Sequence, residues 1–435
     1  MNKYPILNER LYLRSPSINV CFRVIIEGIF DKNKMEEALS KVIMRHPFLK
    51  CSVNIDNGNN AWLVENANPI NLDYFESNEM DWQTWYQEND NIPFDLINGN
   101  LVKFCVICGK NTEVIILGHH VISDGIGYLN LLNDILLALD DRLEMTPQMP
   151  PFETEFKKTV KLSFLEKIYA KGLNKKWKKS RKQFSENDYI GFFEQYRKKC
   201  IPKFYMASIE NEDLNKLLEH GKSNGLSVNE IIASALSLAF MEIMNRNEIS
   251  LGVAANIRNE LVPKPNDCMG NFVTGISANI NFDQQNDFIS NARIITSKIK
   301  EQLENVKNRH MVVHFLNEFD KDLVESIMFA AYGDFDHPVS KKLAELIGEK
   351  SENKGLGISN LGRYGHNVYE NFNVMDLQFI GPSFPANAIT IGIITVNKKM
   401  NICVRFNEGE MKIETVKKIY GKAIKLLLKN NGNFV

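Results

Sequence analysis

The sequence predicts an α/β protein of two domains, in each of which helices pack on a sheet. The chain has 435 residues, which is longer than the roughly 50–250 residues that one domain usually holds. Strand-like and helix-like patterns of apolar residues alternate in both halves. We therefore expect an N-terminal domain over residues 1–160, a basic connecting segment over 161–200 and a C-terminal domain over 201–435.

The first half begins with a run of β-branched residues, Asn19–Glu27, which predicts a strand. Asp31 is a suitable cap for a helix whose apolar stripe runs over residues 35–43. Two further strands, 101–108 and 113–118, are predicted to form a hairpin. The second of them runs directly into a pair of histidines, and a helix with an apolar face follows.

The second half shows the same mixture of patterns. The predicted strands and helices, in chain order, are strand 204–209, helices 211–221 and 228–243, strands 249–255 and 274–281, a long helix to about residue 307, hairpin strands 389–396 and 401–406, and helix 412–428. Between them, residues 355–365 are rich in glycine.

Composition excludes several classes of protein. With 44% hydrophobic and 24% charged residues, the chain resembles an average globular protein, not a disordered or fibrous one. The net charge of −1 gives no reason to expect a nucleic-acid partner. No N-terminal apolar run and no stretch of ~20 apolar residues occurs, so we expect no signal peptide, no transmembrane segment and a cytoplasmic location.

Seven cysteines are scattered along the chain. An odd, dispersed set is not a disulfide framework and is typical of a reducing compartment. The one close pair, Cys105 and Cys108, has no second pair to complete a zinc site. We therefore interpret both as buried strand cysteines.

A strongly basic stretch over residues 157–182 begins just before the connecting segment and continues into it. Its basic residues are Lys157, Lys158, Lys161, Lys167, Lys171, Lys175, Lys176, Lys178, Lys179, Arg181 and Lys182. An apolar helix face is predicted from Leu165, Ile168, Leu173 and Trp177. One interpretation is a solvated interdomain helix. The other is a docking surface for an acidic partner, such as a phosphopantetheine carrier, or for a membrane surface.

The segment His119-His120-Val121-Ile122-Ser123-Asp124-Gly125 concentrates the chemistry. Successive strand residues point to opposite faces, so His119 and His120 are not expected to share a metal ion, and no metal site is predicted. A histidine is suited to general base catalysis because its ordinary pKa is ~6.5. Asp124 is placed either to brace the loop or to pair with a distant arginine, and Gly125 permits a close backbone approach. The alternative is that Ser123 or Asp124 only caps the next helix.

This segment resembles the HHxxxDG signature of the condensation-domain and CoA-dependent acyltransferase superfamily. Other segments resemble that superfamily in the same order along the chain: Arg45–Leu49, Pro93–Gly99 followed by Asn100 in place of the usual proline, Ser227–Glu230, Asn256–Arg258, Met269–Phe272 and Ser359–Gly362. The last of these resembles alcohol and polyketide-associated acyltransferases.

The resemblance implies two chloramphenicol-acetyltransferase-like domains arranged as a V, with a channel between them. It implies that His120 is the general base and that Asp124 is structural and pairs with an arginine, by position Arg258, with Arg363 as the alternative. Strand alternation separates His119 from His120, so we interpret His119 as structural. The donor would be acyl-CoA or an acyl carrier protein, and the acceptor a small-molecule alcohol or amine. We expect no permanently bound cofactor and a monomer.

Direct attack of the acceptor on the thioester needs no acyl-enzyme. Asn271, Ser359 and Asn360 are candidates to position substrate or donate to an oxyanion, although such residues often only form turns. No other histidine is expected to be catalytic: His46, His220, His310, His314, His337 and His366. The competing hypotheses are a stand-alone peptide-synthetase condensation enzyme, a non-catalytic recruitment homologue and an epimerase-type relative.

Overall fold

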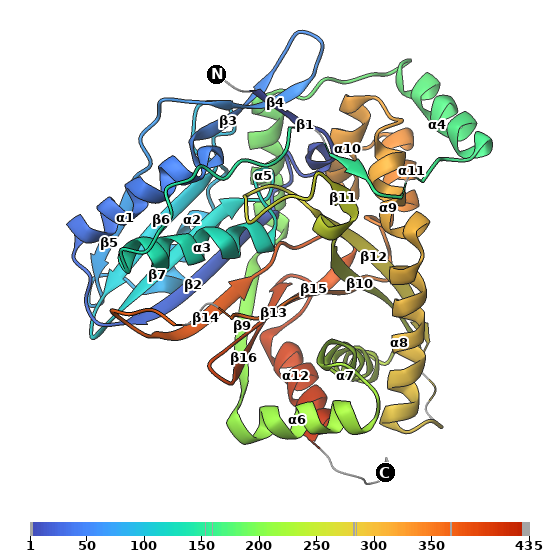
Figure 1. Ribbon diagram of the computed structural model, residues 1–435. Coiled ribbons are helices and arrows are strands. Elements are labelled where there is room, and N and C mark those ends of the chain that lie inside the picture. The colour runs from blue at the N-terminus through green and yellow to red at the C-terminus, as the bar shows by residue number, and fades with distance from the viewer. Residues whose placement is uncertain are drawn as a thin grey trace.

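The computed structural model describes residues 3–152, 154–158, 160–281, 283, 285–365 and 368–428. Two large sheets dominate it (Figure 1). The first sheet has, in order, β14 (Val374–Ile380), β2 (Asn19–Glu27), β7 (Asn111–His119), β6 (Val102–Cys108) and β5 (Leu72–Glu76). The second has β12 (Val273–Asn281), β10 (Glu248–Asn256), β13 (Gly355–Arg363), β15 (Asn387–Val396), β16 (Lys399–Asn407) and β9 (Pro202–Glu210). Two small sheets consist of β1 (Lys3–Ile6), β4 (Ala61–Glu65) and β3 (Cys51–Ile55), and of β11 (Leu261–Val262) and β8 (Glu155–Phe156).

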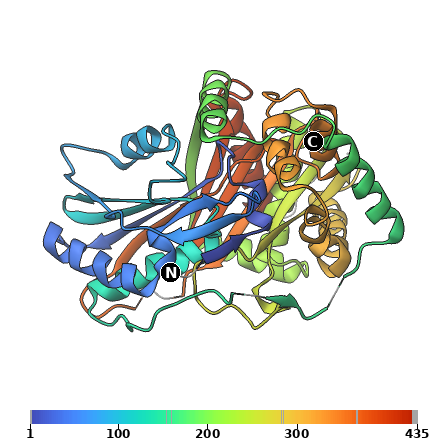
Figure 2. The ribbon, with the colours of Figure 1, turned by 90° about the horizontal axis from the view of Figure 1, so that it is seen from above.

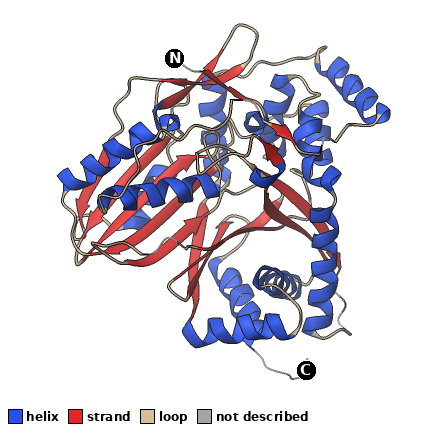
Figure 3. Cartoon of the chain, viewed as in Figure 1, coloured by secondary structure: helices blue, strands red, loops and turns tan. Residues whose placement is uncertain are grey.

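Helices lie against both large sheets, and further helices lie beyond the sheet edges (Figure 3). Those of the first half are η1 (Asn8–Leu11), α1 (Lys32–Arg45), η2 (Pro47–Lys50), α2 (Trp82–Asp90) and α3 (Gly125–Leu139). The connecting segment contributes α4 (Phe164–Trp177) and α5 (Glu186–Lys199). The second half contributes α6 (Asn211–Ser223), α7 (Val228–Ile243), η3 (Arg258–Glu260), α8 (Phe288–Glu304), α9 (Val306–Leu316), α10 (Lys321–Ala331), α11 (Pro338–Leu346) and α12 (Ile413–Leu428).

The first sheet is built around the predicted hairpin of β6 and β7, which pair antiparallel. On the other side of β7 lies β2, paired so that Asn19 is opposite His119. The predicted helix α1 begins after Asp31, whose carboxylate accepts a hydrogen bond from Lys34 N. α1 packs beside α3. Cys105 and Cys108 are buried on β6, as predicted, and every cysteine of the chain lies free.

Strand β14 lies outside its expected unit. It falls within residues 201–435, the range predicted for the second domain, yet it pairs antiparallel with β2 at the edge of the first sheet. It also contacts β15 and β16 of the second sheet. The apolar core of the first sheet accordingly continues into Ile394 and Cys403 of those strands. The boundary between the two units is thus crossed by a strand that the sequence patterns did not predict, and the domain limits stay a prediction.

The second sheet contains the glycine-rich stretch. Its composition favours turns, but it forms β13, a strand paired in parallel with both β10 and β15. Glycine is required there by close packing, because a Cβ on Gly355 would lie 1.9 Å from the carbonyl oxygen of Ser250. The predicted hairpin of β15 and β16 turns at Asn397 and Lys398, both with positive φ. One face of the sheet is covered by α7, α8 and α12.

Helix α4 forms as predicted, but its buried face differs from the expected one. Leu173 and Trp177 are buried with Ala170, whereas Leu165 is 76% and Ile168 49% exposed. The helical period identifies an apolar stripe but not which side another element covers, and here the side that contains the small Ala170 packs on the protein.

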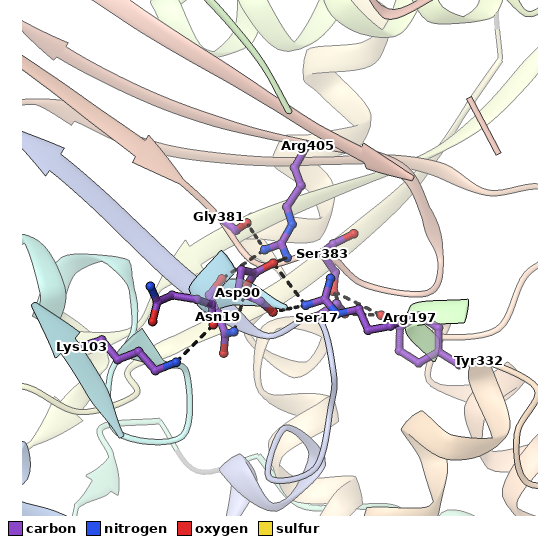
Figure 4. Close-up of polar contacts among 10 residues, drawn as sticks. Ser17, Asn19, Asp90, Lys103, Arg197, Tyr332, Gly381, Ser383 and Arg405 are labelled. Atoms are coloured by element: carbon purple, nitrogen blue, oxygen red, sulfur yellow. Dashed lines mark hydrogen bonds and ion pairs between the residues drawn. The ribbon is translucent and has the colours of Figure 1, made fainter. Parts of the chain in front are cut away.

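Two buried polar clusters join the first half of the chain to later elements. Arg10 and Arg14 both form ion pairs with Glu325 of α10, and all three side chains are buried. In the second cluster, Asp90 accepts a hydrogen bond from Arg405 of β16 at 3.0 Å and from Asn19 of β2 at 2.9 Å (Figure 4). The second cluster joins β2 of the first sheet to β16 of the second through Asp90 of α2.

Among the described residues, no single helix is long and apolar enough to cross a membrane; α6 and α7 together pass such a test only as a pair bent by 100°.

Candidate active site

The histidine pair lies where the first sheet meets the second half of the chain. His119 is the last residue of β7, and α3 begins at Gly125. Asp124 caps that helix, because its carboxylate accepts a hydrogen bond from Gly127 N at 2.8 Å. Asp124 therefore caps helix α3, which is one of the roles that the sequence left open for it.

The Asp124 carboxylate also binds Arg258, as the resemblance implies. The guanidinium donates to Asp124 Oδ2 at 2.8 Å and to Oδ1 at 2.9 Å, and both side chains are buried. Such a two-pronged contact fixes orientation as well as distance. Arg258 is further packed on the ring of Phe272, 4.8 Å from its centroid. The alternative partner, Arg363, is exposed.

Residues 269–272, one of the segments that carry the resemblance, hold the histidine loop from the other side. Gly270 N donates to Ser123 Oγ at 3.2 Å, and Gly270 O accepts from Asp124 N at 3.1 Å. Phe272 N donates to the Asp124 carboxylate at 2.8 Å. Gly270 has φ +141°, and a Cβ there would lie 2.7 Å from the Phe272 ring, so this close approach depends on glycine.

Asn271 contacts the loop itself. Its side-chain nitrogen donates to His120 O at 2.6 Å and to Val121 O at 3.3 Å. Both amide hydrogens are thereby directed at main-chain carbonyls, which fixes the backbone that carries His120. These contacts do not support the predicted donation to an oxyanion.

His119 is enclosed within the first half. Its Nδ1 accepts a hydrogen bond from Val121 N at 3.1 Å, and its ring lies 5.8 Å from that of Phe94. The Tyr128 hydroxyl donates to its carbonyl at 2.8 Å. Burial, with a smaller contribution from His120, lowers the pKa of His119 to about 3. His119 is therefore neutral at physiological pH.

His120 has different surroundings, as strand alternation predicts. Its ring lies 5.2 Å from that of Tyr12, which precedes the first large strand. Burial lowers the pKa of His120, while Asp124, its own main-chain carbonyl and Asn271 act in the opposite direction. A neutral imidazole is the form that accepts a proton. Tyr12 was not predicted, because nothing in the local sequence indicates which distant residue contacts His120.

The end of β13 lies against the same loop. A Cβ on Gly125 would lie 3.1 Å from a side-chain carbon of Leu361 and 3.5 Å from the Phe379 ring, so the glycine permits this contact. The neighbouring residues Asn360 and Ser359, which were candidates to position substrate, contact other residues. Asn360 donates to the side chain of Asn229, and Ser359 lies on β13 opposite Gly392 of β15.

The remaining histidines have separate contacts. His46 lies 2.7 Å from Asp134, His310 2.7 Å from Glu260, His337 2.7 Å from Ser180, His220 3.3 Å from Leu427 O, and the His314 ring 5.2 Å from that of Phe156. His366 lies outside the described residues. Within the described ranges, no three His, Cys, Asp or Glu side chains are grouped to hold a metal ion.

The two sheets and the loop between them form the fold that solved condensation domains and a solved acetyltransferase share. The chain belongs to the condensation-domain family, whose model matches residues 9–315. A curated relative, bacitracin synthase 2 of Bacillus licheniformis, is 23% identical over 364 residues, which cover 77% of this chain. The chain spans 14% of the length of that synthase and 7% of another curated relative.

Solved structures share the fold. The trichothecene 15-O-acetyltransferase TRI3 of Fusarium sporotrichioides matches with a TM-score of 0.67 at 10% identity, covering 98% of this chain and 95% of that one. Polyketide synthase associated protein 5 of Mycobacterium tuberculosis matches with a TM-score of 0.63 at 12% identity, covering 98% and 99%. The predicted mixed fold is thereby confirmed, whereas the V arrangement with a channel stays a prediction.

Proposed function

We propose that this protein transfers an acyl group from a CoA or carrier-protein thioester to a hydroxyl or amine, with His120 as the general base. The observation that carries the proposal is a neutral, buried His120 on a loop held from both halves of the chain. A base must be unprotonated and fixed beside the proton that it removes. Burial favours the unprotonated ring, and the contact of Asn271 with the His120 carbonyl holds the backbone that carries it, which supports the proposal.

In the proposed reaction, the acceptor O–H or N–H gives its proton to His120 as its heavy atom attacks the thioester carbonyl carbon. The resulting tetrahedral intermediate re-forms the C=O bond and expels the thiolate, which takes the proton from the imidazolium. An ester or amide and a free thiol result, without a covalent enzyme intermediate. General base catalysis supplies about 10²–10⁴-fold, so positioning of the two substrates must supply much of the rest.

Asp124 and Arg258 are assigned a positioning role. Their carboxylate and guanidinium are bound to each other and to the main chain, so neither is directed at a substrate. Asn271 is assigned the same role, through the His120 carbonyl. Residues that hold the base act on the rate indirectly, by fixing the direction in which its ring points.

A second candidate is amide formation between two carrier-bound substrates. It is favoured by the family match and by the relatives, which are peptide synthases. On this hypothesis the carrier proteins supply phosphopantetheine thioesters from outside the described chain. The donor is then a carrier, not CoA, and the product an amide, not an ester.

The test is thiol release measured with a panel of acyl-CoAs and acyl-phosphopantetheinyl carriers, each with alcohol and amine acceptors, and with mass spectrometry of the product. His120→Ala should lower turnover by about 10²–10⁴-fold. His220→Ala, the same change at a remote helix, should have no effect. Turnover by His120→Ala at the wild-type rate, or no thiol release by the wild-type protein with any donor, would contradict the proposal; the second result would favour a recruitment role.

A further inference from the structure

Helix α4 is a well-formed but peripheral element. It begins with a reciprocal capping box, in which Glu166 N donates to Ser163 Oγ at 3.3 Å and Ser163 N donates to the Glu166 carboxylate at 2.6 Å. Its buried side packs through Leu173 and Trp177 into an apolar cluster with residues of α10 and α11. Figures 1 and 2 both place α4 at the outer edge of the molecule.

The outward side of α4 is apolar over its first two turns. Phe164 is 77% exposed, Leu165 76%, Ile168 49% and Tyr169 41%. Their spacing places Phe164, Leu165 and Ile168 on one surface of the helix, opposite the buried Leu173 and Trp177. Four large apolar side chains exposed together on one helix form a patch of the kind that marks an interaction site.

The same helix is strongly basic. Five of its lysines or flanking lysines are exposed and have no acidic partner in the described part of the chain: Lys161, Lys167, Lys171, Lys175 and Lys176. The only acid of residues 157–182 is Glu166, and its carboxylate is occupied by the helix cap and by Lys307 at 3.0 Å. The surface of α4 therefore combines exposed apolar side chains with uncompensated positive charge.

We propose that α4 is an interfacial helix that binds an anionic lipid surface. A helix with Phe and Leu on one side and lysines around them lies in the plane of a membrane, with its apolar side chains about 5–10 Å deep in the headgroup boundary. The surface potential of anionic lipids attracts the lysines. This inference concerns a surface remote from His120 and does not depend on the proposed acyl transfer.

An acidic protein is the less suitable partner on these observations. A protein partner for a helix of this type usually receives the apolar side chains in a groove and fixes them individually. Here the apolar side chains are exposed on a helix at the outer edge of the molecule, and the exposed lysines of the same helix have no acidic partner in the described part of the chain. A flat, fluid, negatively charged surface satisfies both features at once.

The binding test uses flotation of the full chain with vesicles of phosphatidylcholine and phosphatidylglycerol, and with vesicles of phosphatidylcholine alone. Binding is expected to the anionic vesicles only and should weaken as salt is raised. The combined variant Phe164→Ser, Leu165→Ser and Ile168→Ser should bind at least tenfold more weakly, because each fully buried large side chain contributes on the order of tenfold. The matched control places the same change at exposed apolar residues elsewhere: Ile29→Ser, Met44→Ser and Leu346→Ser.

A second variant removes charge from α4: Lys167→Gln, Lys171→Gln, Lys175→Gln and Lys176→Gln. Each lysine near an anionic surface contributes about fivefold in partitioning, so the combined loss should be about a hundredfold or more. The matched control changes the net charge equally at exposed lysines on and beside α12: Lys412→Gln, Lys417→Gln, Lys418→Gln and Lys425→Gln. It should retain most of the binding.

Three results would overturn the proposal. The wild-type chain does not bind anionic vesicles, whether or not it binds an acidic carrier protein; the serine variant binds as tightly as the wild type, so that no apolar insertion occurs; or the glutamine variant of α4 binds as tightly as its matched control on α12. Thiol release in lipid-free solution, with soluble substrates, serves as the separate readout. It should be equal in the wild type and all four variants, so a failure of lipid binding and a failure of acyl transfer are distinguishable.

Discussion

Asp124 and Arg258 lie 134 positions apart in the chain and are joined by two hydrogen bonds, of 2.8 and 2.9 Å. The same carboxylate accepts from Gly127 N at the start of α3 and from Phe272 N of the second half. One side chain therefore fixes the start of a helix, a distant main-chain segment and a buried arginine. Because His120 lies four residues before Asp124, the position of its ring depends on contacts from both halves.

The first prediction is that Asp124→Asn lowers the free energy of unfolding by about 3–5 kcal/mol, because it leaves the buried Arg258 without its charge partner. Arg258→Met should also destabilise. The double variant should lose less than the sum of the single losses, with a coupling of about 1–3 kcal/mol, because removal of both charges leaves neither one buried alone. Urea denaturation of the four proteins measures this. Strictly additive losses would show that the two side chains are not energetically coupled.

The second prediction compares two helical glycines. A Cβ on Gly127 would lie 2.0 Å from Ser123 Oγ and 3.3 Å from the Met269 backbone, so Gly127→Ala should destabilise by about 1–3 kcal/mol. It should also lower thiol release, because the loop that carries His120 must move. Gly172 on α4 is exposed and has nothing within 4 Å of a Cβ, so Gly172→Ala should stabilise by about 0.4–1 kcal/mol. Urea midpoints that shift in the same direction would contradict the steric explanation.

How much the sequence predicts depends on how local the cause is. The hairpin of β6 and β7, the histidine loop and the start of α3 follow from neighbouring residues, and they form where the patterns placed them. Strand β14 was not predicted, because its position depends on β2, far away in the chain. The buried side of α4 was assigned partly wrongly, because periodicity does not show which neighbour covers a helix.

In the candidate site, too, features with a local cause were predicted and contacts with distant residues were not. The residue types suggest a general base at His120 and a loop-stabilising carboxylate at Asp124. Arg258 was indicated by the resemblance to the family and not by the spacing of residues. Asn271 was a candidate to donate to an oxyanion or to position substrate, and in the structure its amide nitrogen donates to the carbonyls of His120 and Val121. A polar side chain in a loop satisfies whichever main-chain groups the tertiary fold brings near it, and one sequence does not reveal them.

The third prediction concerns the pH dependence of stability. Burial lowers the pKa of His119 from its ordinary 6.5 to about 3 in the folded chain. At a pH between about 3 and 6.5, the His119 imidazole binds a proton in the unfolded chain but not in the folded chain. The free energy of unfolding contributed by this group is therefore fully present above pH 6.5 and falls by up to about 1.4 kcal/mol per pH unit as the pH is lowered.

The control for this effect is His119→Asn, whose side-chain oxygen keeps an acceptor near the position of Nδ1 for Val121 N. The variant lacks the titrating group, so its stability should fall less steeply between pH 6.5 and pH 4.5 than that of the wild type. Urea denaturation across that interval gives both slopes. Parallel slopes would mean that His119 takes up its proton equally in the folded and unfolded chains.

The last prediction concerns the polar cluster between the two sheets (Figure 4). Although burial acts to raise it, the pKa of Asp90 is lowered by Arg405 and Arg197, so the carboxylate is charged at neutral pH. Asp90→Asn leaves two arginines without a buried counter-charge and should destabilise by about 3–5 kcal/mol. Arg405→Met leaves the carboxylate with Arg197 at 3.3 Å and Asn19 at 2.9 Å, so it should destabilise less. Thermal and urea unfolding rank the two variants, and the reverse order would mean that packing of the Arg405 side chain, not its charge, holds the sheets together.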